Sequence, residues 1–180
     1  MTMVLYLLAI VAVLGASDTI YYHEWRARLP GLGKSARDEL QLHAFRDYVY
    51  AILFGTLPWF AWQGAWAAVL AALLLTETVL TMWDFIVEDW IRKPLGGVYP
   101  GERVMHGIMG IVYGAMLAFI VPVMMDWWHA PSALSFEPVP VSPVLRQIMN
   151  VLALVVFLSG VRDFCAAYEV RGSAWPWKGH

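Results

Sequence analysis

Residues 39–50 read ELQLHAFRDYVY and residues 102–113 read ERVMHGIMGIVY, so both segments fit the pattern E-x-x-x-H-x-x-x-x-x-V-Y. Residues four apart in a helix lie on the same face, so each segment presents a carboxylate and an imidazole to one point. Because the pattern occurs twice, it predicts two similar helices that contribute to one polar site.

The sequence around these two segments is typical of a membrane protein. Hydrophobic residues make up 60% of the 180 residues and charged residues only 14%, against about a quarter in soluble proteins. A helix that spans a bilayer needs roughly 20 mostly apolar residues. Five segments meet this requirement: 3–25, 44–63, 65–91, 104–126 and 144–168. We therefore expect an all-α integral membrane protein with five transmembrane helices in a single transmembrane domain, residues 1–180.

The segments between these helices carry turn signals. They read LPGLG at 29–33 and KPLGGVYPG at 93–101, and a proline-rich stretch follows an aromatic one within 127–143. Gln63 and Gly64 predict a tight return, and Pro58 predicts a kink inside the second helix. Helices 1–2 and 3–4 would each run inward, turn through a basic Gly/Pro loop and return with E-x-x-x-H. This order predicts a parallel tandem repeat of two helix pairs, with the fifth helix closing one side.

The positive charges predict the orientation. All but one of the twelve Lys and Arg residues fall at the same ends of the five helices, and the exception is Arg146. Because positively charged short loops stay in the cytoplasm, we expect a multi-pass protein of the inner (plasma) membrane with its N-terminus outside and its C-terminus cytoplasmic. The first apolar segment has no basic residue before it, which favours a retained helix over a cleaved signal peptide. The sequence has no basic patch of the kind that would indicate nucleic-acid binding.

The acidic residues are the most informative feature, because a charged side chain inside a bilayer costs about 2.5–3.5 kcal/mol even on the lenient insertion scale. Asp18, Asp84 and Asp163 each lie eight residues before an arginine, which is roughly 12 Å inside the charged boundary. Glu77 lies deeper and shares a helical face with Asp84 and Glu88, so this stripe should face protein. The sequence therefore predicts one acidic layer to which all five helices contribute.

Carboxylates and imidazoles from several helices form the ligand set of a carboxylate-bridged dinuclear metal site. Such ligands favour a divalent metal, with iron first and manganese or zinc as alternatives. The inventory resembles that of four-helix di-iron membrane oxidases at the level of the site only, since the usual spacing there is Glu-x-x-His, one residue shorter than here. The candidate metal ligands are Asp18, Glu39, His43, Asp84, Glu88, Glu102 and His106, and Asp47, Glu77 and Asp163 extend the polar site.

Tyr50 and Tyr113 lie two turns beyond the two histidines and are the candidate catalytic residues, as hydrogen-bond donors to ligands, contacts for a substrate head group or electron relays. The alternative for both is a packing role with a satisfied hydroxyl group. Glu39 and Glu102 are also placed where negative charge caps a helix N-terminus. His23 lies about 140° around an α-helix from Asp18, so we do not expect these two residues to share a target.

Three classes of function fit these features. The first is a membrane-embedded, metal-dependent oxidoreductase, with a dinuclear iron site near the cytoplasmic side, that acts on a lipophilic substrate from the lipid bilayer. The possible partners are a separate electron donor and further copies of the chain in a homo-oligomer. The second is a proton- or cation-coupled transporter or channel subunit that uses the intramembrane acids. The third is a non-catalytic accessory subunit whose charged inner layer binds a partner.

Overall fold

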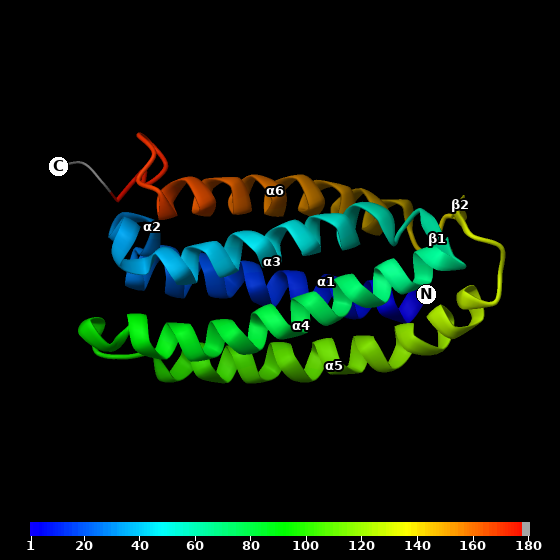
Figure 1. Cartoon of the computed structure of the whole chain (residues 1–180), viewed down its shortest axis with the longest axis horizontal. Coiled ribbons are helices and arrows are strands. Elements are labelled where there is room, and N and C mark those ends of the chain that lie inside the picture. Colours follow the sequence, from blue (N-terminus) through cyan, green and yellow to red (C-terminus); the bar gives the residue numbers. More distant parts are fainter. Residues whose placement is uncertain (178–180) are drawn as a thin grey trace.

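Five long helices run alternately up and down along the longest axis of the molecule, as the computed structural model shows (Figure 1). The structure describes residues 1–177, so Lys178 of the basic C-terminal segment lies outside the described residues. The long helices are α1 (Thr2–Asp18), which the π-helix η1 (Thr19–Ala27) continues, α3 (Arg37–Thr56), α4 (Ala65–Ile91), α5 (Pro100–Trp128) and α6 (Pro143–Ala167). The short elements are α2 (Leu29–Leu32), η2 (Gly33–Ala36), η3 (Lys93–Leu95), β1 (Phe60–Gln63) and β2 (Ala133–Phe136).

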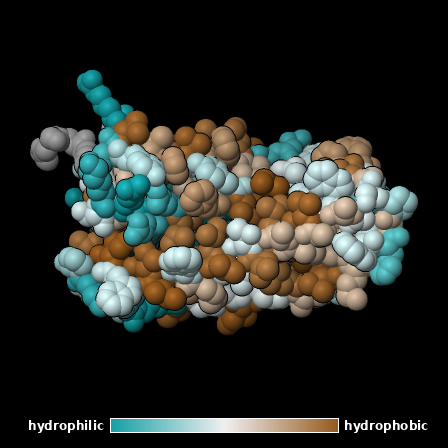
Figure 2. All heavy atoms as spheres, viewed as in Figure 1, coloured by the Kyte–Doolittle hydropathy of each residue, from teal (hydrophilic) through white to brown (hydrophobic). Residues whose placement is uncertain are grey.

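Four of these helical segments are long and apolar enough to cross a membrane: Thr2–Ala27, Ala65–Ile91, Pro100–Trp128 and Pro143–Ala167. Helix α3 has the length, but its charged residues between Arg37 and Asp47 keep it outside this group by composition. On the face in Figure 2, apolar side chains cover the middle of the molecule and hydrophilic ones gather toward its two ends. These features indicate a membrane protein, and the predicted all-helical class with five long helices is confirmed.

The second helix differs from its predicted range. Helix α3 begins at Arg37 and ends at Thr56, so Pro58 lies after the helix and causes no kink. Pro58 has no backbone N–H to donate to the preceding turn, which explains why the helix stops before it. The last four residues of the predicted helix form β1, which pairs antiparallel with β2. Phe60 lies opposite Phe136 and Gln63 opposite Ala133.

The packing is uneven among the helices. Helix α3 lies along α6 and also contacts α4, and α1 lies along α5. Gly160 allows the close approach of α6 to α3, because a Cβ atom at this position would lie 3.0 Å from the carbonyl oxygen of Ala44. A large apolar core fills the half of the bundle that holds the N-terminus, and a smaller one with Ala36 and Leu40 lies near α2 at the other end. The buried polar residues are placed between the two.

Candidate metal centre

Ten buried polar residues from all five long helices meet in one layer, and we call this group the polar cluster. Each is at most 8% exposed, which confirms that the predicted acidic stripe of α4 faces protein. The members are Asp18 and His23 from α1 and η1, Glu39 and His43 from α3, Asp84 and Glu88 from α4, Arg92 directly after α4, Glu102 and His106 from α5, and Asp163 from α6. These residues come from helices that are far apart in the sequence. They meet in one layer because each helix carries its polar residues at a similar depth.

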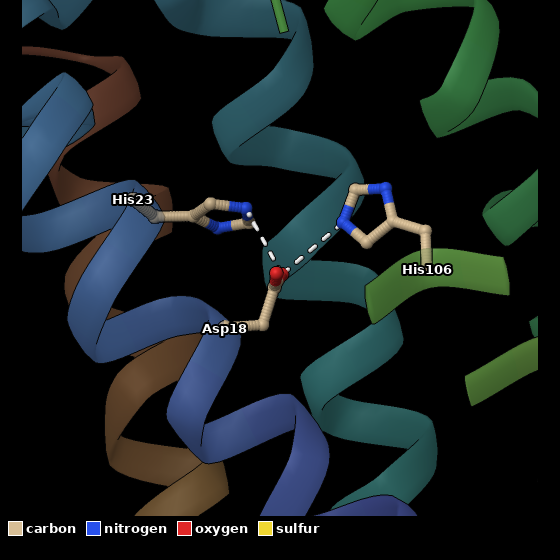
Figure 3. Close-up of side chains that lie close together, drawn as sticks. All are labelled: Asp18, His23 and His106. Atoms are coloured by element: carbon tan, nitrogen blue, oxygen red, sulfur yellow. Dashed lines mark hydrogen bonds and ion pairs between the residues drawn. The ribbon is translucent and has the colours of Figure 1, made fainter. Parts of the chain in front are cut away.

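Asp18 lies between two imidazole rings (Figure 3). Its Oδ2 atom is 3.1 Å from Nε2 of His106 and 3.3 Å from Nε2 of His23. The three residues offer ligand atoms that all lie within 4.8 Å of one another, which is close enough for one metal ion to bind them together. Two imidazole nitrogens and one carboxylate oxygen are common ligands of iron and zinc.

The sequence reasoning missed His23, and the cause is the local helix type. Residues Thr19–Ala27 form a π-helix, in which hydrogen bonds join residues five apart. Residue i+5 therefore lies close to the face of residue i, so His23 follows Asp18 on the same side, whereas an α-helix would turn it away. Helical π segments occur frequently at functional sites. No feature of the sequence marked the wider turn, since it depends on the packing of η1 against its neighbours.

A second group of three ligands shares His106 with the first. The ligand atoms of Glu88, Glu102 and His106 also lie within 4.8 Å of one another. The Nδ1 atom of His106 is 3.3 Å from Oε1 of Glu88, and the ring of Phe85 stacks on the imidazole at a centroid distance of 5.0 Å. Glu102 reaches toward the first group as well, since its Oε1 atom is 3.2 Å from Nε2 of His23. Glu102 is therefore the carboxylate best placed to bridge two ions.

His43 joins the cluster from the opposite side. Its Nε2 atom is 3.3 Å from Oδ2 of Asp84, and its Nδ1 atom is 4.0 Å from Oδ2 of Asp163. The imidazole stacks on His23 with a centroid distance of 4.5 Å and an interplanar angle of 5°. Asp84 also accepts a hydrogen bond of 2.8 Å from Nη1 of Arg46. Among the described residues, His43 and Asp84 belong to neither group of three ligands, so they border the candidate ion sites.

Arg92 holds the two glutamates of the repeated segments. Its Nε and Nη2 atoms donate hydrogen bonds to Glu39 at 2.8–3.2 Å, and Nη2 also donates to Glu102 at 3.3 Å. Burial alone would lower the pKa of Arg92, but its hydrogen bonds to Glu39 and the charges of Glu39, Glu102 and Glu88 raise this pKa above its usual value. Glu102 in addition caps α5, because its Oε2 atom accepts a hydrogen bond from the backbone N–H of Tyr99. Glu102 therefore both caps the helix, as the alternative interpretation expected, and belongs to the polar cluster.

The two candidate tyrosines lie deeper in the bundle than the cluster. The hydroxyl group of Tyr50 donates to Oε1 of Glu77 at 2.8 Å, and the same oxygen accepts from Thr81 at 2.8 Å. The hydroxyl group of Tyr113 donates to the carbonyl oxygen of Leu74 at 3.4 Å. The structure therefore places both tyrosines beside Glu77 and outside the two ligand groups.

Several buried acceptor atoms of the cluster have no hydrogen-bond donor among the described residues. These atoms are Oδ1 of Asp18, Oδ1 of Asp84 and Oε2 of Glu88. Buried polar groups in proteins are almost always satisfied, so unpaired carboxylate oxygens at this depth call for an additional cation or donor. The oxygen and nitrogen atoms of the two ligand groups come from α1 with η1, α4 and α5, and such a donor set fits a divalent metal ion.

Comparisons with protein-family models, with curated proteins and with solved structures gave no match for this chain.

Proposed function

We propose that the protein is a membrane-embedded oxidoreductase that binds two divalent metal ions, iron first among them, in the polar cluster. The observation that carries this proposal is the pair of three-residue ligand groups, Asp18–His23–His106 and Glu88–Glu102–His106, which are buried side by side. The two groups meet at His106, whose neutral imidazole has one lone pair and would bind one of the two ions. The carboxylates of Glu88 and Glu102 would hold the other ion next to it. Bundles of this kind hold dinuclear iron or manganese centres between facing helices.

The charge of the cluster supports a dinuclear site. Two guanidinium groups, those of Arg46 and Arg92, pair with three of its six carboxylates, which leaves a formal charge of −4 when the three histidines are neutral. Uncompensated charge in a buried site is very unfavourable. Two divalent cations would neutralise it and would leave the histidines free to act as ligands. Protonation of the histidines would neutralise most of the charge but would use up their lone pairs.

The chemistry that such a pair of ions supplies is activation of dioxygen next to a C–H bond. In a hydroxylation of this class, one oxygen atom enters the C–H bond and the other leaves as water, with the uptake of two electrons and two protons. The electrons would come from a separate protein donor at the cytoplasmic side, and the lipophilic substrate would arrive from the bilayer. The apolar layers on both sides of the cluster support this reaction, because they exclude water from the reacting atoms.

Transport receives less support from the contacts. The polar residues continue from Asp84 through Arg46 toward Glu77, whose Oε1 atom is 4.0 Å from Nε of Arg46. Beyond Glu77, the described interior consists of apolar side chains such as Leu70 and Ile120. A path for protons or cations would need polar groups or water through this half of the bundle. We therefore propose the enzyme and not the transporter.

The test is the metal content of the purified protein. We expect about two iron, manganese or zinc ions per chain after purification in mild detergent without chelators. The variant His106→Ala should lose nearly all bound metal, because His106 belongs to both ligand groups. The matched control is His129→Ala, which removes an exposed imidazole at the other end of α5 and should leave the metal content unchanged.

Two results would contradict the proposal. One is a wild-type protein that stays metal-free after incubation with iron(II) under anaerobic conditions. The other is a His106→Ala variant with the full wild-type metal content. Size-exclusion chromatography of both variants shows whether a loss of metal is caused by misfolding.

A further inference from the structure

A cavity of about 320 Å³ adjoins the polar cluster between α1 with η1, α3 and α6. Its polar end is formed by Asp18, His23, His43 and His106, so it reaches the first ligand group directly. Its other end is lined by apolar residues that lie closer to the N-terminal end of the bundle: Val11 and Ala12 of α1, Phe54 of α3, and Leu152 and Val156 of α6. The cavity therefore changes from polar to apolar along the direction of the helices.

The cavity is long and narrow. His43 and Phe54 are eleven residues apart on α3, so the lining extends over roughly 16 Å along the helix axis. The volume is at the lower end of the range of about 300–1,000 Å³ that small-molecule sites occupy. These dimensions fit one hydrocarbon chain or a narrow ring system, and they are too small for the two chains of a phospholipid.

The side of the cavity faces the surface of the apolar region. Two of its lining residues are strongly exposed, Ile20 at 67% on η1 and Val155 at 54% on α6. Ala16 is also exposed and lines the cavity, and its small side chain leaves the space between the two helices open. In a membrane, exposed apolar residues at such a rim face lipid, so the opening between α1 and α6 faces the bilayer.

The inner end of the cavity is closed by an ion pair. Arg162 of α6 bonds to Glu24 of η1, and Nε1 of Trp177 donates to the same carboxylate at 2.8 Å. The other lining arginine, Arg46, is occupied by Asp84. Both lining arginines are therefore paired, and the acids Asp47 and Asp163 also border the polar end. This charge pattern favours a neutral polar head over an anionic one.

From these contacts we propose that the cavity binds the substrate, a single-chain lipophile with a neutral polar or reactive end, which arrives sideways from the bilayer between α1 and α6. The identification of the bound molecule as a substrate rests on the proposed function. The apolar chain lies against Phe54, Leu152 and Val156, and the neutral end lies next to His23 and His106. Access from the membrane keeps the reacting end out of water throughout binding.

The experiment uses photolabelling of the full-length protein in lipid nanodiscs. The probe is a long-chain primary alcohol with a diazirine group in the chain, and the comparison probe is the carboxylic acid with the same chain. Peptide mass spectrometry locates the labelled residues, and the metal content of every sample is measured in parallel. In the wild-type protein we expect the alcohol to label α6 around Leu152 and Val156 more strongly than the lipid-facing residues of α4, and the acid to label them much less.

The variant Ala16→Trp places an indole across the opening and should reduce labelling at Leu152 and Val156 about tenfold, which corresponds to roughly 1.4 kcal/mol of binding free energy. The matched control is Ser17→Trp, since Ser17 is the next residue, equally small and exposed, and does not line the cavity. This control should label like the wild type. Both variants should keep the wild-type metal content, because neither residue belongs to the polar cluster.

The outcomes separate the two proposals. Three results overturn the cavity proposal even if metal is bound. They are labelling that is uniform over all lipid-facing helices, labelling that is equal in Ala16→Trp and the wild type, and labelling that is stronger with the acid than with the alcohol. Labelling confined to the cavity in a protein that never binds metal supports the binding site and contradicts the metal centre. An Ala16→Trp sample that does not elute as a monodisperse peak is replaced by Ala16→Leu, with the same expected direction.

Discussion

At the scale of single residues, Arg92 has the most demanding position. It lies directly after α4, is fully buried, and holds one glutamate from each of the two E-x-x-x-H segments. The desolvation of three charges is costly, and it is compensated only while the hydrogen bonds between them are intact. Arg103 gives the opposite case, because its ion pair with Asp89 lies at the surface with both side chains more than half exposed.

This contrast predicts different costs for the same substitution. Arg92→Gln leaves Glu39 and Glu102 buried without their cation, and it should lower the free energy of unfolding by about 3–5 kcal/mol in protein treated with chelator. Arg103→Gln should cost at most about 1 kcal/mol, since exposed pairs contribute little. Unfolding of both variants in mixed detergent micelles with increasing SDS measures the difference. Equal losses would mean that Arg92 does not hold the two glutamates as described.

At the scale of helices and strands, the sequence predicts most of the structure, and its failures have local causes. The range predicted for α4 matches the observed helix, because a glycine precedes its start and a long apolar run fills it. For the second helix, the predicted apolar span of 44–63 runs past Pro58, whereas the observed helix includes the charged turns from Arg37 and ends at Thr56. For the site, helical spacing correctly grouped Glu102 with His106, whereas the π-helical turn that adds His23 follows from tertiary packing.

The π-helix itself leads to a test by moving one histidine. An α-helix would turn residue 23 away from Asp18, whereas in the π-helix His23 lies 3.3 Å from it. His23→Ala should lose metal, and Tyr22→His combined with His23→Ala should lose as much, because the ring of residue 22 packs against Tyr99 and this residue belongs to neither ligand group. Elemental analysis measures the metal content of both variants.

The single variant Tyr22→His is the control for the loss of the tyrosine, and it should keep its metal because His23 stays in place. Recovery of metal binding in the double variant would contradict the assignment of residue 23 as the ligand that η1 supplies, since a histidine at residue 22 would then bind equally well.

At the scale of the whole molecule, the contacts of the cluster repeat between two halves. His106 of α5 meets Asp18 of α1, and His43 of α3 meets Asp84 of α4, while Arg92 lies between Glu39 and Glu102. Helices α3 and α5 therefore each pair their histidine with the acid from the first helix of the other half. This exchange supports the predicted tandem repeat, and it explains why neither half would complete the site alone.

The side of the membrane on which the polar cluster lies is testable. The basic loops next to the cluster predict that this end faces the cytoplasm. In a Cys165→Ser background, a new cysteine at the exposed Pro131, beside β2, should react with a membrane-impermeant maleimide on intact cells. A cysteine at the exposed Ser35, in η2, should react only after the membrane is permeabilised.

Labelling of Ser35→Cys and not Pro131→Cys on intact cells would reverse the orientation and would place the electron donor on the outer side. Labelling of both positions on intact cells would show that the preparation leaks, and the background protein without cysteine gives the level of unspecific reaction.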